Sequence, residues 1–539
     1  MVNSVPQIFN ETGRKSKEEF GSKNEDTGSY GLGHRHIQAF LMFICLTFGY
    51  IASGHAGVTI VAMSIPENTT NQTVNSKLNS KLERNETHDI VRYLDIYQIY
   101  DWPKSIHEII LGSFFLGTAV MMFPISLLGQ RFGGKVLLQI SLAVNAVTSI
   151  VAPWLIAWGG WISFAVLRFL QGGSQAGLYP GIQFLVTHWF PVSERNSLSS
   201  FIYAGSGIGC TLAFFLAGVL ADSKLGYPAT FWLVGIISSV PFFLITFFGT
   251  TTPSEHKLVS EKEKNYIVRD HVEEVVMKPK VPWNKIFTSI PLWATVIAHV
   301  GNSVAFLFFF MQVPSYMVGV LNFNIMASGI LTALSYLGSC IAALAFGNLS
   351  DYLTNRQVIN MKMARIIFNS IACVIPAICL IIVAYTNSSV LAVVCFVIFS
   401  TANSGHHFGW MGNYMDLSPN YCGSLMSIGN IISNFLGIVL PIITSFVVTD
   451  MSNRYQWRIL ILLMAGCTFV SNVIFIIFMS ADIQPWNKGD EEEEEEVNRL
   501  VWQNSWSNTR QHILTFLTKT ENRETQSYHP VSRHTLREV

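Results

Sequence analysis

The chain has 539 residues, of which 50% are hydrophobic and only 13% are charged, so it is far more apolar than a typical water-soluble globular protein. Basic and acidic residues number 34 each, so the formal net charge is zero and we expect no nucleic-acid partner. The eight cysteines show no zinc-binding spacing, and most lie inside apolar runs, so no metal site is expected. Lipid is therefore the expected solvent for most of the chain.

A polar stretch, residues 1–36, precedes the first long apolar run at 37–63. This run is too long for the core of a signal peptide and lacks a cleavage pattern of the right geometry. We therefore expect an N-terminal tail followed by a first membrane helix that stays in the mature protein.

Eleven more apolar runs follow, each long enough to cross a hydrocarbon layer of ~30 Å. They lie at 107–128, 136–157, 161–187, 198–221, 229–250, 290–317, 325–347, 366–386, 390–412, 422–447 and 458–479. Because backbone amides in lipid must be paired within their own segment, runs of this length must be helices. The sequence thus predicts an all-α membrane protein with twelve transmembrane helices.

The twelve expected helices form two groups of six. The first group spans 37–250 and the second spans 290–479, with a polar central loop at 251–289 and a polar tail at 480–539. An acidic run at 490–496 lies in that tail, where such a block is usually solvated, and the Leu500-Val501 pair after it faintly resembles a sorting signal.

Basic residues in the short loops indicate orientation, because they concentrate on the cytoplasmic side. Arg131, Lys135, Arg195, the lysine-rich stretch 257–285 and the stretch 356–365 all fall on one side. The 64–106 loop falls on the other side and carries glycosylation sequons, and a further sequon lies between helices nine and ten: Asn68, Asn71, Asn85 and Asn387. We expect both termini in the cytoplasm and these asparagines outside.

A weak repeat relates the two groups. Residues 126–135 after helix two and 347–356 after helix eight are both small-x-Leu segments that end in a cation, at the interval expected for a duplication of six helices. We expect Arg131 and Asp351 to form ion pairs that hold the cytoplasmic ends of the halves together in one conformation. An ordinary polar turn carrying basic topology signals is the alternative.

Arg168 is the main candidate for a binding residue, because a charge in the middle of a membrane needs a partner or a wet cavity. Gln171 and Gln175 share its helix face. A guanidinium beside amides can bind two oxygens of a carboxylate or phosphate at once. The alternative is a structural arginine paired with a backbone carbonyl or with a carboxylate elsewhere.

Other polar side chains fall inside the expected helices. The candidates are His55, Tyr179, Asn302, Tyr316, His299 and the His406-His407 pair. A histidine could carry protons near neutral pH, yet a single intramembrane histidine is at least as often one partner of an interhelical hydrogen bond.

Several segments, in order, resemble one transporter family. They are Gly112-Ser-Phe-Phe-Leu-Gly117, Arg131-Phe-Gly-Gly-Lys135, Arg168-Phe-Leu-Gln-Gly172, Tyr179-Pro180, Trp189-Phe-Pro191-Val-Ser-Glu194-Arg195, Pro314-Ser-Tyr316 and Asn413-Tyr-Met-Asp416. Across about 35–485 the chain resembles the anion/cation symporter family of the major facilitator superfamily, which includes type I phosphate cotransporters, sialin and vesicular glutamate transporters. The resemblance implies two pseudo-symmetric six-helix halves with a substrate site between them.

Charges that many family members carry are missing here. Ser53 stands where the family has a basic residue, Leu111 where vesicular members have histidine, Gln175 where proton-coupled members have an acid, and Asn302 where vesicular members have arginine. His55 stands at a position that is usually Asn. Only Arg168 of this charged set remains, which disfavours a vesicular glutamate-type mechanism and leaves a phosphate-like or organic anion as the substrate.

We therefore expect a secondary active transporter of small anions that works by alternating access, without a cofactor, as a monomer in the lipid bilayer. Arg168 would attract the anion, with Gln171, Gln175, Tyr179, Asn302 and His55 around it and with Arg131, Asp351, Glu194 and Arg195 as gating residues. Sodium or the membrane potential is favoured over protons for coupling, because residue 175 is not an acid.

Two other readings remain open, a non-transporting membrane sensor and an uncoupled anion channel. An enzyme is not expected, because no nucleophile, metal or phosphate-loop motif is present. The plasma membrane is the expected location, with vesicular and lysosomal membranes as alternatives.

Overall fold

The computed structural model describes residues 31, 33–64, 96–274 and 281–488. Asn68, Asn71, Asn85 and the 490–496 run lie outside these residues. In the described part, every long element is a helix, and the one β-bridge joins Ser64 to Tyr100. The predicted all-α fold class is confirmed.

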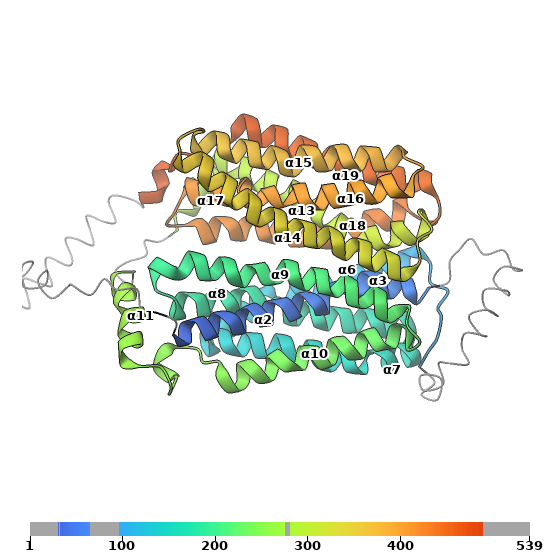
Figure 1. Ribbon diagram of the computed structural model, residues 1–539, viewed down its shortest axis with the longest axis horizontal. Helices are drawn as coiled ribbons and strands as arrows, with labels where there is room; N and C mark the ends of the chain where they lie inside the picture. The colour runs from blue at the N-terminus through green and yellow to red at the C-terminus, as the bar shows by residue number, and fades with distance from the viewer. Residues whose placement is uncertain (1–30, 32, 65–95, 275–280, 489–539) are drawn as a thin grey trace, which may run out of the picture.

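The described residues of the N-terminal half form seven helices of the bundle (Figure 1). They are α2 (His34–Gly54) with α3 (Ala56–Ala62), α6 (Lys104–Phe132), α7 (Gly134–Gln175) with α8 (Leu178–Trp189), α9 (Val192–Ala221) and α10 (Gly226–Phe248). Two helices absent from the prediction, α11 (Glu261–Glu274) and α12 (Trp283–Phe287), lie within the expected central loop.

The C-terminal half repeats this plan. Its helices are α13 (Ile290–Gly319), α14 (Ile325–Asn355), α15 (Met361–Tyr385), α16 (Ser389–Asn403) with α17 (Trp410–Leu417), α18 (Cys422–Val447) and α19 (Arg454–Phe478). Short 3-10 turns lie at Pro253–Glu255, Ser404–His407 and Pro485–Lys488. The repeated segments predicted from the sequence fall at the ends of α6 and α14, the second long helix of each half.

Eleven helices in the described residues are long and apolar enough to cross a membrane, and one of them, Gly134–Trp189, crosses twice. As one straight helix, its 56 residues would measure about 84 Å, far more than a bilayer core of ~30 Å. The chain instead turns back at Gly160, whose φ of 59° and ψ of −143° are not helical. Asn145 then contacts Gln175, and Ser149 contacts Gln171, as in an antiparallel hairpin centred on Gly160. Twelve crossings result, as predicted.

Several helices begin earlier than their apolar runs because asparagine side chains cap them. Asn360 accepts a hydrogen bond from the Met363 amide and starts α15, and Asn453 accepts from the Tyr455 and Gln456 amides and starts α19. These bonds satisfy amides that have no partner inside the helix. The apolar runs predicted for these helices begin later, at 366 and 458.

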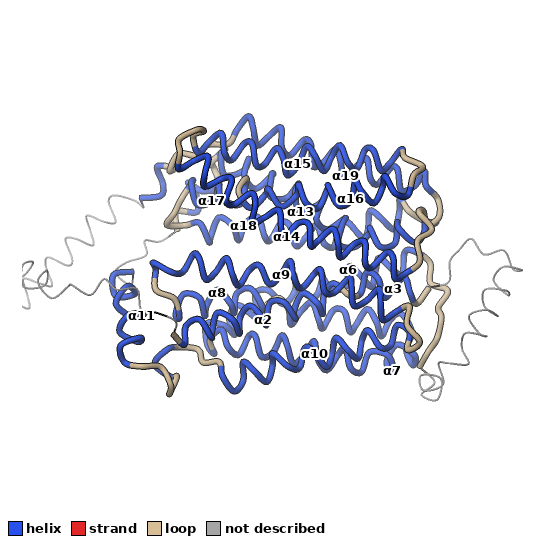
Figure 2. The backbone as a smooth tube through the Cα atoms, in the orientation of Figure 1, coloured by secondary structure: helices blue, strands red, loops and turns tan. Residues whose placement is uncertain are grey.

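The outer surface of the bundle is apolar. Large hydrophobic side chains such as Phe123, Trp158 and Phe446 are 73%, 86% and 80% exposed in the isolated chain. Water-soluble monomers rarely expose apolar surface on this scale, so these side chains face lipid. Figure 2 shows the helices running side by side along the long axis of the bundle.

The two halves lie one above the other in Figure 1, with α13 to α19 uppermost. They meet where α9 packs on α14, α6 packs on α18 and α3 packs on α13. Gly218 of α9 approaches Gly329 of α14 so closely that a Cβ atom on Gly218 would lie 2.8 Å from the Gly329 Cα. We call the end of the bundle where α3 stops and α6 starts the loop end, and the opposite end, which carries α11, the α11 end.

Candidate functional site

Arg168 lies in the second arm of the α7 hairpin and is 2% exposed. Its Nη1 donates to Ala52 O at 3.4 Å and to Gln171 Oε1 at 3.0 Å, and its Nη2 donates to Ser53 O at 3.1 Å. The guanidinium also lies 4.6 Å from the centre of the Phe114 ring. In this conformation, therefore, Arg168 makes the backbone contacts expected of a structural arginine.

The partners of Arg168 are nevertheless unusual, because all of them are neutral. Two arginines and one lysine are buried in the described part of the chain. Arg35 contacts Glu194 and Glu263, and Lys104 contacts Glu108, whereas Arg168 contacts only carbonyls, an amide and an aromatic ring. A buried charge without a counter-ion is costly, so this guanidinium can accept an anion.

The two glutamines predicted beside Arg168, Gln171 and Gln175, contact α2 and the first arm of the α7 hairpin. Gln171 Nε2 donates to Ser149 Oγ at 3.2 Å. Gln175 Nε2 donates to Gly49 O at 2.9 Å, and its Oε1 accepts from Asn145 at 3.2 Å. The sequence did not predict Ser149 and Asn145 as partners, since they lie in a neighbouring segment that the turn at Gly160 brings close.

Tyr179 continues the same face and is 43% exposed. Its hydroxyl lies 2.8 Å from that of Tyr50, and its ring stacks on Tyr203 of α9 with centroids 5.8 Å apart. The Tyr203 hydroxyl donates to Gln183 Oε1 at 2.8 Å. Three tyrosines from three helical segments thus extend the polar face beyond Gln175.

His55 lies between α2 and α3, two residues after Ser53, and its φ of −60° and ψ of −28° keep the two helices in one continuous membrane span, His34–Ala62. Its side chain is fully buried, neither ring nitrogen has a hydrogen-bond partner among the described residues, and the ring meets Phe231 edge-on at 5.3 Å. The sequence predicted an uninterrupted helix here, and the span His34–Ala62 confirms it. His55 follows, in this span, the residues Ala52 and Ser53 whose carbonyls Arg168 binds.

Asn302 is the predicted site residue that the structure does not bring to this group. It lies in α13 of the other half and donates to Asn403 Oδ1 at 2.6 Å. His299 and His406, the other histidine candidates of that half, both stack on Trp410, with centroids 3.8 and 5.6 Å apart. These contacts lie within the C-terminal half.

The predicted gating residues separate into two groups. Arg131 lies over the ring of its neighbour Phe132, and both Arg131 and Asp351 are exposed. No ion pair joins these two side chains in the conformation that the described residues adopt. They lie at the ends of α6 and α14, where the repeat placed them.

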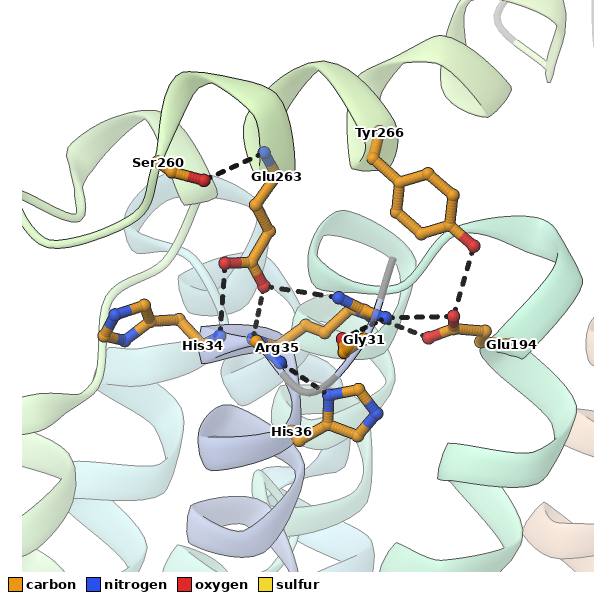
Figure 3. A network of polar contacts seen from close by, with 9 residues as sticks. Gly31, His34, Arg35, His36, Glu194, Ser260, Glu263 and Tyr266 are labelled. Atoms are coloured by element: carbon orange, nitrogen blue, oxygen red, sulfur yellow. Dashed lines mark hydrogen bonds and ion pairs between the residues drawn. The ribbon is translucent and has the colours of Figure 1, made fainter. Parts of the chain in front are cut away.

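Glu194 instead anchors three segments at the α11 end (Figure 3). Its carboxylate accepts from Arg35 Nε at 2.7 Å, from Arg35 Nη2 at 3.0 Å and from the Tyr266 hydroxyl at 3.1 Å. Glu263 of α11 accepts from the His34 and Arg35 amides and so caps α2. The Arg35 hydrogen bonds hold the pKa of Glu194 below its usual range. The adjacent Arg195 is partly buried at the same end of α9.

Two further features bear on the predictions. Asn387, the sequon within the described residues, is exposed between α15 and α16, and Arg454 donates to its side-chain oxygen. Lys104 and Glu108 at the start of α6 are buried, and their pairing was not predicted, because the expected helix began at residue 107 and so included Glu108 but not Lys104. Their spacing of four residues is a signal that could have indicated an ion pair.

Comparison with known protein families gives a match over most of the chain. The sequence profile of the Major Facilitator Superfamily matches residues 42–441. Among curated relatives, sialin from Ovis aries is 30% identical, with 72% of this chain and 79% of sialin covered. A Drosophila melanogaster protein provisionally named an inorganic phosphate cotransporter is 27% identical, with 85% and 87% covered.

Solved structures show the same fold at low sequence identity. A bacterial homologue of the human lysosomal transporter Spinster, in an inward-facing and unoccupied conformation, matches with a TM-score of 0.59 and 13% identity. That match covers 85% of this chain and 100% of the other. A D-xylose–proton symporter matches with a TM-score of 0.57 and 14% identity, covering 82% and 98%.

Proposed function

Since the chain belongs to the major facilitator superfamily, and within it to the anion/cation symporter family, we propose that it transports a small anion by alternating access, coupled to a cation. It is a multi-pass membrane transporter and not an enzyme. We place the loop end outside and the α11 end in the cytoplasm of a plasma-membrane protein. The basic loops and the exposed Asn387 sequon support this orientation.

The observation that carries the proposal is the buried Arg168 guanidinium, which has only neutral partners among the described residues. A carboxylate or phosphate would supply the missing negative charge and bind two nitrogens at once. The anion would displace the Ala52 and Ser53 carbonyls, which belong to the same membrane span as α3. Because α3, later in this span, packs on α13, anion binding would act on one contact between the halves.

An organic anion with one negative charge is the substrate class that fits best. One guanidinium balances one charge, and the Tyr50, Tyr179 and Tyr203 rings beside Gln175 offer surface for an organic group. Inorganic phosphate is the second candidate, supported by the similarity to a relative named for phosphate transport.

Sodium or the membrane potential is the proposed driving force. Both ends of the Gln175 amide are engaged by neutral partners, and the described residues place no carboxylate in contact with Arg168. Among the described residues, no carboxyl group beside the arginine is therefore available as a proton carrier.

Uptake into proteoliposomes tests the proposal. The purified protein would be given labelled phosphate and a panel of labelled organic monoanions, with sodium, proton and potential gradients imposed one at a time. We expect saturable uptake driven by sodium or by the potential. Uptake driven by a proton gradient alone would refute the coupling. Absence of uptake for every anion would favour a sensor, and non-saturating currents would favour a channel.

A further inference from the structure

The loop end of the bundle contains a buried polar cluster formed by Lys104, Glu108 and Gln312. Lys104 and Glu108 lie one turn apart on α6, with Nζ and Oε1 2.6 Å from each other. Gln312 of α13 accepts from Lys104 Nζ at 3.1 Å and donates to Glu108 Oε2 at 2.8 Å. Their exposures are 2%, 1% and 0%, so the three side chains form a closed triangle away from solvent.

The triangle joins the two halves of the protein. Lys104 and Glu108 belong to the N-terminal half, and Gln312 belongs to the C-terminal half. Trp457 of α19, also in the C-terminal half, lies 5.4 Å from the Lys104 ammonium. On the N-terminal side, His107 and Ser64 are 2.8 Å apart and tie α6 to the end of α3. The cluster therefore joins the N-terminal half to the C-terminal half at the loop end of the bundle.

We propose that this triangle is the outer gate of the transporter, closed in the present conformation and opened when Gln312 withdraws with the C-terminal half. The proposal rests on the proposed orientation, which places the loop end outside. Opening must break both Gln312 hydrogen bonds, because α6 and α13 move with different halves.

The distribution of charge makes this gate reversible. Both ions lie on the same helix, so the ion pair stays intact when the halves separate and only a neutral amide leaves. Separating two buried opposite charges would cost far more than exchanging two hydrogen bonds for water. Water that enters from outside can replace the amide at both ions. The gate therefore stabilises the closed conformation but does not prevent it from opening.

Leu111 provides a position for detecting the opening. It lies three residues beyond Glu108 on α6, is 4% exposed and belongs to a hydrophobic cluster that contains residues of both halves. A cysteine at this position should react with a membrane-impermeant methanethiosulfonate applied outside only when the gate opens. The native protein, with its own cysteines, gives the background rate.

The experiment compares Leu111→Cys with Leu111→Cys/Gln312→Met in intact cells. Methionine keeps the side-chain size and removes both hydrogen bonds to charged groups, so labelling should accelerate roughly tenfold or more. Gln456→Met is the matched control, since Gln456 lies at the same end and its hydrogen bonds, to Thr449 and Asp450, stay within the C-terminal half. It should leave the labelling rate unchanged.

Two further variants separate the possible causes of failure. Ser388→Cys, exposed at the loop end, should label rapidly from outside, and if it does not, the orientation is wrong. Lys104→Met/Glu108→Leu removes the ion pair as a whole and should accelerate Leu111→Cys labelling even if Gln312→Met fails to reach the surface. Equal labelling rates in all variants, with Ser388→Cys reactive, would overturn the gate. This readout needs no substrate, so it is independent of the anion proposal.

Discussion

At the scale of single residues, Gln175 uses both ends of its amide, donating to Gly49 O and accepting from Asn145. A carboxylic acid can reproduce both contacts only while it is protonated. An ionised carboxylate has no hydrogen to donate, and it would leave the Gly49 carbonyl without this partner. We therefore propose that the residue at position 175 determines whether transport responds to protons.

We expect Gln175→Glu to make transport acid-stimulated. At neutral pH, uptake should fall roughly tenfold, because the ionised side chain loses its bond to Gly49 O. Uptake should recover as the pH is lowered, whereas the native protein should change little. Gln175→Met, which cannot titrate, is the control. A Gln175→Glu variant with the native pH profile would show that residue 175 does not contact the transport pathway.

Glu194→Gln tests the junction of α2, α9 and α11. We expect the free energy of unfolding in detergent at pH 7 to fall by about 1–3 kcal/mol, because the Arg35 bonds lose their charged acceptor. Since the pKa of Glu194 is lowered, its contribution is present above the usual glutamate pKa of about 4.3 and disappears as the pH falls through the lowered value. The difference between native and variant proteins should shrink only at acidic pH.

The surface residue Glu261 provides the control for this prediction. Its side chain is 80% exposed and pairs with Lys264 on α11. Exposed ion pairs contribute little, so Glu261→Gln should leave the melting temperature unchanged at every pH. A Glu194→Gln melting temperature equally unchanged at pH 7 would contradict the structural role of Glu194.

At residue scale, sequence reasoning identifies side-chain types but not their partners. Arg168 could be singled out because a cation is rare inside an apolar run. Its contacts with Ala52 O and Ser53 O could not be predicted, since backbone carbonyls carry no sequence signal. Asn302 was grouped with Arg168, but the structure gives it a partner in its own half, Asn403.

At the scale of helices, continuous apolar runs in the sequence were sufficient to predict the membrane crossings. They were not sufficient to predict where a helix is interrupted. The 3-10 turn at Ser404–His407 lies inside the apolar run predicted as one helix. At this turn, Gly405 packs close to Phe368 O and Gly409 close to Asn369 of α15. These contacts are tertiary, so they cannot be predicted from the hydrophobic periodicity of the sequence. The caps at Asn360 and Asn453 could have been found from local signals.

Gly160→Ala tests the hairpin within α7. A Cβ atom at Gly160 would meet nothing within 4 Å, so any cost comes from the backbone, whose φ of 59° suits glycine. We expect a loss of about 1–3 kcal/mol of stability, measured as thermal unfolding in detergent. Gly466→Ala, also with nothing within 4 Å but inside helix α19, should not destabilise the protein. Equal melting temperatures for the two variants would argue against the turn at Gly160.

At the scale of the whole molecule, two halves touch along a few helix pairs and must separate at alternate ends for transport. The division into six and six helices could be predicted from the polar central segment and the weak repeat. The contacts between halves could not, because they join residues more than 100 positions apart, such as Gly218 with Gly329.

Gly218→Ala should hinder the present conformation, since the new Cβ atom would lie 2.8 Å from the Gly329 Cα. We expect a lower maximal uptake rate at normal surface expression, because one conformation of the cycle becomes less accessible. Gly423→Ala in α18, where a Cβ atom meets nothing within 4 Å, should transport normally. Unchanged uptake in Gly218→Ala would mean that this contact does not form during the cycle.

Anion uptake by Arg168 variants tests the central claim most directly. Labelled anion uptake would be compared for native protein, Arg168→Lys and Arg168→Ala, each corrected for the amount at the cell surface. We predict that Arg168→Ala abolishes saturable uptake and that Arg168→Lys retains a small part, because lysine keeps the charge but not the planar fork. Native uptake in Arg168→Ala at normal surface expression would contradict the assignment of this arginine as the anion site.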